Sequence, residues 1–243
     1  MTLEFTRLSQ LTGDPKYFDA VQRVSDVLEK HQNRTKIPGL FPILVSPLRE
    51  EFDVDGAFTM GGMSDSLYEY IPKQYLLLGG LSEQYRNLYE NAIEAAKKHL
   101  FYRPLIPQDQ NILISGNARI SSAGSVKLEP DGQHLACFAG GMVALAAQVF
   151  NRTEDLDVAR KLVAGCIWAY DSMPMGIMPE TFRMIPCHDE DDCAWDIKKW
   201  HAAIKSAYSA DYHTLQWDVP DIIKADGLQP GFSKIGDPRY LLR

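Results

Sequence analysis

The stretch Leu11-Thr-Gly-Asp-Pro-Lys-Tyr-Phe-Asp-Ala20 decides the fold of this chain, because it has the composition of a tight turn between two helices. Apolar residues lie on both sides of it at spacings of three and four residues, which is the spacing of one face of an α-helix. Asp14 followed by Pro15 matches the residues preferred at the N-cap and at the first position of a helix. The stretch therefore predicts a hairpin of two helices, of which the first includes Leu3 to Leu11.

Two further turns have similar surroundings, and they are Leu78-Gly-Gly-Leu-Ser-Glu-Gln-Tyr85 and Phe150-Asn-Arg-Thr-Glu-Asp-Leu-Asp-Val-Ala159. The helices that lead into them are expected over 65–78, with a kink at Pro72, and over 134–150. The three turns recur about every 70 residues, a period that is typical of repeated helical hairpins. The alternative is that the similarity is generic, because any helical protein places Ala and Leu on its inner faces.

The excursions between these hairpins are predicted to be extended. Short apolar and β-branched runs, bounded by Gly, Pro and Asn, indicate β-hairpins, and they occur at Leu40–Ser46, Gly56–Met60, Asn111–Ser115, Ser125–Glu129 and Gly176–Arg183. If all of them leave the same end of the stacked helix pairs, they form one loop-rich face, where functional sites are common. A fourth helical pattern lies within 194–217, and the chain from Val219 onward is expected to be irregular.

The composition limits the possible partners of the chain. The 243 residues have a formal net charge of -7, which argues against nucleic acid or an anionic membrane surface as a partner. No apolar run is long enough to span a membrane, and the first residues lack the pattern of a signal peptide. Two Asn-x-Thr glycosylation sequons are present, at Asn33 and at Asn151; they matter only if the chain enters the secretory route.

The four cysteines form two pairs in the sequence. Cys137 and Cys166 lie at equal distances from the third turn, so they lie at the same height in an antiparallel helix pair. A disulfide between them is therefore geometrically reasonable, and it is favoured over two buried free thiols. Cys187 and Cys193 enclose an acidic segment, for which an exposed loop closed by a disulfide is favoured over a metal site.

One predicted helix carries two carboxylates that can point into the same cleft. Asp65 and Glu69 lie four residues apart, after the pair Gly61-Gly62, and positions i and i+4 share a helix face. Tyrosines flank them, as is common in carbohydrate sites. The alternative is structural, since Glu69 also lies four residues before Lys73 and can form a solvated ion pair of little energetic value.

The ordered motifs of the chain resemble glycoside hydrolase family 47, the class I α-1,2-mannosidases that trim high-mannose N-glycans. The resemblance rests on five segments taken together, namely Leu3–Asp14, Met63–Tyr70, His134–Gly141, Met178–Phe182 and Asp237–Arg243. It also includes the spacing of Cys137 and Cys166. It implies a single, incomplete catalytic domain over 1–243, which is part of an (α/α)7 barrel with β-hairpins at one end and a conserved disulfide.

The resemblance also implies a reaction and its site. Hydrolysis of terminal α-1,2-linked mannose with inversion needs an acid and a base, with a water between the base and the sugar. Asp65 matches an essential carboxylate, expected to be the general acid, and Glu69 and Glu180 match acids of the sugar and Ca2+ pocket. His134 and Arg243 match substrate-binding positions. Met63 falls where some members have an arginine that selects the glycan branch.

Several expectations follow from where the chain departs from the family pattern. The catalytic glutamate of an early helix, the general base expected after Arg243 and the threonine that ligates Ca2+ are missing, so Ca2+ has no direct ligand assigned here. The chain alone is therefore expected to be inactive. The alternative is a non-catalytic remnant that binds glycans or other proteins. The partner is a high-mannose oligosaccharide or glycoprotein, and the location is the secretory pathway (ER or Golgi) or outside the cell, by resemblance only.

Overall fold

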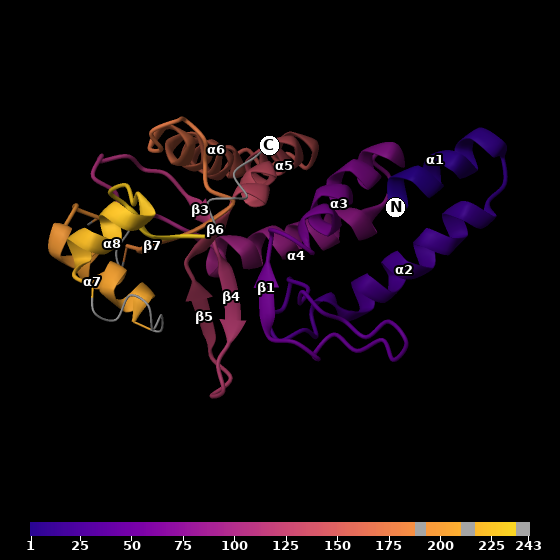
Figure 1. The fold of residues 1–243 in the computed structure, drawn as a ribbon. Coiled ribbons are helices and arrows are strands. Elements are labelled where there is room, and N and C mark those ends of the chain that lie inside the picture. Colours follow the sequence, from indigo (N-terminus) through magenta and orange to yellow (C-terminus); the bar gives the residue numbers. More distant parts are fainter. Residues whose placement is uncertain (188–192, 210–216, 237–243) are drawn as a thin grey trace.

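The structure of the protein is a computed structural model that describes residues 1–187, 193–209 and 217–236. Three pairs of antiparallel helices form its framework (Figure 1). The pairs are α1 (Thr2–Thr12) with α2 (Lys16–Gln32), α3 (Asp65–Leu77) with α4 (Glu83–His99), and α5 (Phe138–Val149) with α6 (Asp155–Asp171). These are the three helical hairpins that the sequence predicts.

The turns between paired helices form as their residue types require. Gly13 ends α1 in the left-handed conformation at φ 72°, and its N–H donates to the carbonyl of Ser9; glycine adopts this conformation at little cost. The side chain of Asp14 accepts a hydrogen bond from the N–H of Lys16 at 3.1 Å. It therefore acts as a cap, although the second helix begins at Lys16, one residue later than predicted. Helix α3 continues through Pro72 to Leu77.

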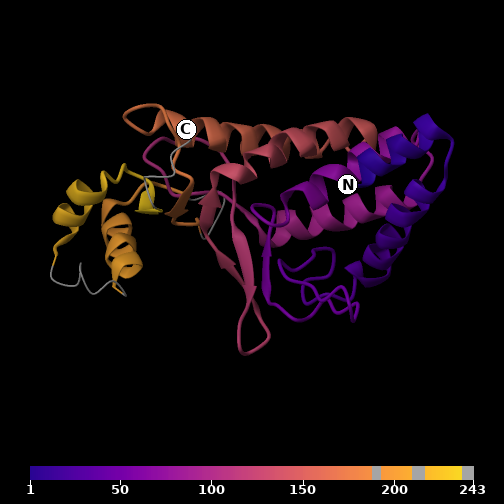
Figure 2. The same ribbon diagram turned by 45° about the vertical axis from the view of Figure 1, so that its right-hand side comes forward.

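The first helices of the three pairs lie next to one another. Helix α3 contacts α1 on one side and α5 on the other, and α2 contacts α4 in the second row. Figure 2 shows the α5–α6 pair extending beside the other two pairs. All three turns lie at one end of the pairs, so every excursion leaves from the opposite end, as expected.

The strands differ from the predicted local hairpins, because most of them pair with distant segments. One antiparallel sheet has the order β1–β4–β5 (Ala57–Thr59, Asn117–Ile120 and Val126–Glu129). Another has the order β6–β7–β8 (Asp131–Gln133, Thr181–Met184 and Phe232–Ile235), and β2 (Phe101–Tyr102) pairs with β3 (Ile114–Ser115). β4 and β5 form a local hairpin, but β4 lies outside the predicted runs, and the predicted run Asn111–Ser115 ends in β3, which pairs with β2 instead. Residues 40–45 form no strand.

The last part of the described chain is more regular than predicted. Helix α7 (Ile197–Tyr208) lies within the predicted helical region, but α8 (Val219–Asp226) and β8 lie in the segment expected to be irregular. Asp218 caps α8 by accepting from the N–H of Asp221, and Gly227 ends it at φ 62°. A proline in the first turn is compatible with a helix, so the Pro- and Gly-rich composition marks the ends of a short helix here.

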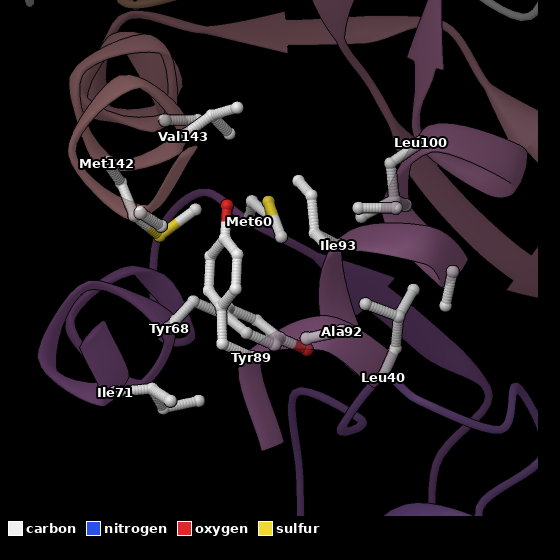
Figure 3. Packing of buried hydrophobic residues seen from close by; sticks show 14 of the residues in the cluster. Leu40, Met60, Tyr68, Ile71, Tyr89, Ala92, Ile93, Leu100, Met142 and Val143 are labelled. Atoms are coloured by element: carbon white, nitrogen blue, oxygen red, sulfur yellow. The ribbon is translucent and has the colours of Figure 1, made fainter. Parts of the chain in front are cut away.

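Two apolar cores hold these elements together. The larger core lies between the helix pairs and β1, and it includes the fully buried rings of Tyr68 and Tyr89 (Figure 3). Tyr68 accepts a hydrogen bond from the backbone N–H of Phe41 at 2.9 Å, and burial raises the pKa of its phenol. The second core joins α6, α7, α8 and the β6–β7–β8 sheet around Trp168 and Phe232, whose rings stack with centroids 5.2 Å apart.

Candidate functional site

The first candidate residue, Asp65, begins helix α3 directly after a tight turn. The N–H groups of Ser64 and Asp65 both donate to the carbonyl of Gly61, at 3.1 and 3.0 Å. Met63 in this turn has φ 76° with an exposed side chain, a conformation that costs an L-residue energy and that often occurs at functional sites. Asp65 is half-buried, and the positive end of the helix dipole stabilises its carboxylate there.

Glu69 lies one turn further along α3 and forms the ion pair that the structural alternative predicts. Its Oε1 lies 2.5 Å from Nζ of Lys73, and the two side chains are 34% and 41% exposed. Because the pair is well solvated, it contributes little to stability. The carboxylate of Glu69 is thus partly neutralised by Lys73, whereas the carboxylate of Asp65 has no hydrogen-bond partner within the described part of the chain.

His134 and Glu180 come together where β6 and β7 end. Gln133 pairs with Thr181 across the two strands, and the N–H of His134 donates to the carbonyl of Glu180 at 2.9 Å. The Nε2 atom of His134 lies 2.5 Å from the hydroxyl of Tyr170. The Tyr170 hydroxyl thus holds the imidazole through Nε2, and Nδ1 has no hydrogen-bond partner within the described residues. Both His134 and Glu180 are half-buried.

Gln133 connects this pair to the helix that carries Asp65. Its Oε1 accepts from the N–H of Gly62 at 3.0 Å, and its Nε2 donates to Oδ1 of Asn117 at 3.3 Å. The side chain thereby joins three elements, which are β6, β4 and the turn before α3. The backbone packs closely at this junction, because a Cβ atom on Gly61 would lie 2.4 Å from the Gln133 oxygen. The start of α3 and the end of β6 therefore form one neighbourhood.

The disulfide expected between Cys137 and Cys166 is present, and it supports the same neighbourhood. Cys137 ends the 3-10 helix η1 (His134–Cys137), and Cys166 lies on α6, one helical turn before Tyr170. The covalent bond thus joins the two elements that carry the His134–Tyr170 contact. Cys187 and Cys193 are also bonded to each other, in agreement with a loop closed by a disulfide; the acidic residues between them lie outside the described residues.

An ion pair next to the site stabilises the β6–β7 edge. Both guanidinium nitrogens Nε and Nη2 of Arg183 donate to the carboxylate of Asp131, at 2.6 and 2.7 Å. The hydrogen bond with Asp131 raises the pKa of Arg183, against the effect of burial. This bidentate geometry is the strong form of the contact, and it fixes the strand that leads into His134.

A metal site requires several ligand side chains close together. Within residues 1–187, 193–209 and 217–236, no group of three or more His, Cys, Asp or Glu side chains is arranged to hold a metal ion. Ca2+ needs six to eight oxygen ligands. The described acids at the site, Asp65, Glu69 and Glu180, do not form such a set.

The structure brings some of the predicted site residues together and leaves others apart. Asp65, His134 and Glu180 lie in elements that Gln133 and the β6–β7 pairing join, Glu69 lies at the surface beside Lys73, and Arg243 lies outside the described residues. Sequence reasoning missed Gln133 and Tyr170. Tyr170 had a usable signal, because it follows Cys166 by one helical turn and His134 precedes Cys137 by three residues. Gln133 had none, since no local pattern marks a residue that bridges three elements.

Comparisons with known proteins agree on one family. The family model described as glycosyl hydrolase family 47 matches residues 1–243. A probable mannosyl-oligosaccharide alpha-1,2-mannosidase 1B from Aspergillus fumigatus is 34% identical over 210 residues, which are 86% of this chain and 39% of that protein. The mannosyl-oligosaccharide 1,2-alpha-mannosidase IB of Mus musculus is 31% identical over 186 residues, covering 74% of this chain and 27% of the relative.

A solved structure shows the same fold. The alpha-1,2-mannosidase from Trichoderma reesei aligns with a TM-score of 0.69 and 25% identity, over 86% of this chain and 41% of that one. The helix pairs described above align with part of its (α/α)7 barrel, and they do not close into a barrel within the described residues. The chain spans about two fifths of the length of the first relatives and of this structure.

Proposed function

Because this chain belongs to glycosyl hydrolase family 47, we propose that it is part of an α-1,2-mannosidase that removes terminal α-1,2-linked mannose from high-mannose N-glycans. The match to the family over all 243 residues carries this proposal, and the names of the relatives support it. The site agrees with it, since Gln133 joins the turn before Asp65 to β6, and the β6–β7 pairing brings His134 and Glu180 together.

In this proposal Asp65 is the general acid. It donates a proton to the glycosidic oxygen while the bond from that oxygen to the anomeric carbon breaks, directly or through a water. A base-activated water attacks the opposite face of the sugar, so that the configuration at the anomeric carbon is inverted. His134 holds a sugar hydroxyl through Nδ1, since Nε2 is engaged by Tyr170. Glu180 contacts the sugar, Glu69 does so only if it leaves its ion pair with Lys73, and Arg243 binds substrate.

Calcium is the cofactor that the family suggests, but the residues described here do not fit it. No cluster of three acidic, His or Cys side chains forms within residues 1–187, 193–209 and 217–236. A cation that grips sugar hydroxyls needs several oxygen ligands, and the acids near His134 do not supply them together. The proposed reaction therefore contains no step through Ca2+.

The substrate implies that the protein works where N-glycans are processed, in the secretory pathway or outside the cell. Within the described residues, no helix is long and apolar enough to cross a membrane. The net charge of -7 suits a neutral glycan substrate better than a polyanion. An oligosaccharide carried by a glycoprotein is therefore the proposed partner.

Calorimetric titration of the purified chain with α-1,2-mannobiose tests the proposal. Maltose serves as the control ligand, and released mannose is measured in the same mixtures. We expect mannobiose alone to bind, Asp65→Asn to reduce any hydrolysis by at least about a hundredfold, and His134→Ala to weaken binding. Asp19→Asn is the matched control, because Asp19 is 61% exposed and lies on α2, in a solvated pair with Arg23.

Each outcome separates the alternatives. Binding with hydrolysis that depends on Asp65 supports the enzyme. Binding without hydrolysis agrees with the expectation that this chain alone is inactive; a longer chain completed at both ends then separates an enzyme, which releases mannose, from a glycan-binding remnant, which does not. A folded chain that binds neither sugar contradicts both the enzyme and the glycan-binding remnant. An equal loss of hydrolysis in the Asp19→Asn variant shows that the effect of Asp65→Asn is not specific to the site.

A further inference from the structure

We propose that Asn151, in the turn between α5 and α6, is an N-glycosylation acceptor, and that Asn33 is a poorer one. Both asparagines begin an Asn-x-Thr sequon, which identifies candidate acceptors but does not distinguish them. The structure distinguishes them through the threonine, since the transferase must reach both the asparagine amide and the threonine hydroxyl. The inference concerns modification of this chain and does not depend on its hydrolytic activity.

The asparagine and the threonine of the sequon at Asn151 are both accessible. Asn151 and Thr153 are both exposed, and the Thr153 hydroxyl has no hydrogen-bond partner within the described part of the chain. Arg152 between them turns inward, where its Nε donates to Asp155 at 2.7 Å and its Nη2 donates to Glu94. Arg152 thus anchors the turn. Asn151 and Thr153, which the transferase recognises, are exposed to solvent.

In the sequon at Asn33, the threonine side chain is buried and hydrogen-bonded. Asn33 is exposed at the end of α2, but Thr35 is only 5% exposed. The Thr35 hydroxyl lies 2.7 Å from the carbonyls of both Ile37 and Leu40. To present this hydroxyl, the loop after α2 would have to open and leave buried carbonyls without a donor, which costs about 1–3 kcal/mol for each one. Asn33 is therefore available chiefly before the loop has folded.

A structural role accounts for the presence of Asn151 in this turn, but not for the presence of Thr153. Asn151 follows the C-cap residue Phe150 with φ 55°, and the N–H of Arg152 donates to the carbonyl of Ala147 at 2.8 Å. This is a Schellman-type helix end, in which asparagine is tolerated because it adopts the left-handed conformation more readily than most residues. The cap needs nothing from the Thr153 side chain, so the complete sequon is more than the cap requires.

The modification would leave the candidate site open. Asn151 lies at the far end of the twelve-residue helix α5 from His134, and a helix of that length spans about 18 Å. Figure 2 shows α5 and α6 running together towards this turn, away from the strands. A glycan on Asn151 would therefore cover the tip of the hairpin, whereas the β6–β7 junction would remain accessible to a substrate.

The covalent step uses a lipid-linked diphospho-oligosaccharide as the glycosyl donor. The Nδ2 atom of Asn151 forms a bond to C1 of the first sugar, and the bond from C1 to the diphosphate oxygen breaks. The electron pair of that bond leaves with the lipid diphosphate, and the amide gives up one proton to a base of the transferase. No oxidant or reductant is needed.

Expression of the full chain behind a cleavable secretory signal in eukaryotic cells tests the proposal, with peptide mass spectrometry as the readout of occupancy. Asn151 is expected to be occupied, and Asn151→Gly and Thr153→Ala are expected to abolish its glycan. Asn151→Gly is the matched control for folding, because glycine keeps the left-handed helix end; its unfolding midpoint should be no lower than that of the unglycosylated wild type. Asn33→Gln should leave the Asn151 glycan in place.

A reductant added to the cells during synthesis separates the two sequons further. Because it delays disulfide formation and folding, occupancy of Asn33 should rise, while occupancy of Asn151 should stay constant. An unmodified Asn151 peptide, obtained while a co-expressed reporter glycoprotein is fully occupied, would overturn the proposal. Equal occupancy of both asparagines without reductant would overturn the argument from Thr35.

Discussion

Replacing Gly61 by alanine tests how the turn before Asp65 is joined to the rest of the site. The new Cβ atom would lie 2.4 Å from Oε1 and 2.7 Å from Cδ of Gln133, distances at which one group must move. Since Gln133 has a flexible side chain, it should swing away rather than displace the backbone. It would then lose its hydrogen bonds with the N–H of Gly62 and with Asn117.

The cost follows from these two contacts. A hydrogen bond of this kind contributes about 1 kcal/mol net, so Gly61→Ala should lower the free energy of unfolding by about 2 kcal/mol. Gly62→Ala is the matched control, because its Cβ would meet Gln133 and Leu135 at 3.6 and 3.7 Å, which are ordinary contact distances. Neither glycine has positive φ, so the control should change stability by less than about 1 kcal/mol.

Urea unfolding monitored by circular dichroism measures these differences, and a double-mutant cycle with Gln133→Ala tests their cause. Once the Gln133 side chain is gone, Gly61→Ala has nothing to displace, so the double variant should be no less stable than Gln133→Ala alone. The coupling energy should therefore be about 2 kcal/mol. The reasoning is refuted if Gly61→Ala costs the same in both backgrounds, or if Gly62→Ala costs as much as Gly61→Ala.

Three further predictions concern the framework around the site. Met63→Gly should raise the unfolding midpoint, since glycine removes about 1–2 kcal/mol of left-handed strain at φ 76° and costs less than that in chain entropy. Replacing both Cys137 and Cys166 by serine should lower the free energy of unfolding by roughly 3.5 kcal/mol, from their separation of 29 residues; unchanged urea unfolding would contradict this. Backbone hydrogen bonds from Lys198 and Lys199 lower the pKa of Asp196, the cap of α7. The cap is therefore complete above the ordinary carboxyl pKa and is lost as the pH falls through the lowered value. Asp196→Asn should remove that part of the acid dependence of the helical signal, and an identical acid titration would refute it.

The helix pairs could be predicted because their signals are local. Apolar stripes at helical spacing define α1 to α6, and the turns carry residues that end helices, such as Gly13 and Asn151 in the left-handed conformation. The symmetry of Cys137 and Cys166 about the third turn was also visible in the sequence. Each of these features depends on neighbours within a few residues or on one antiparallel pairing.

The strand pairing could not be predicted, because its partners are distant in the sequence. Ala57 pairs with Arg119 and Gly132 pairs with Phe182, and strands of two to four residues contain too little pattern to specify a register. The hairpin β4–β5 is local, since its turn is closed by hydrogen bonds between Ser121 and Ser125, but the sequence indicated Asn111–Ser115 as its first strand. The expected set of local hairpins was wrong for this reason.

The same distinction explains which parts of the candidate site were found. Asp65 and Glu69 were found as an i, i+4 pair on one helix, but the sequence could not decide whether Glu69 faces a ligand or Lys73; the structure shows the ion pair. His134 and Glu180 were identified by resemblance, and their contact depends on the pairing of β6 with β7. A Cβ atom on Gly132 would lie 2.3 Å from the ring of Phe182, so this pairing requires a glycine one residue before Gln133. The elements that carry the candidate residues Asp65 and His134 are thus joined by Gln133 and by the close packing at Gly61 and Gly132, none of which belongs to a motif that marks the site in the sequence.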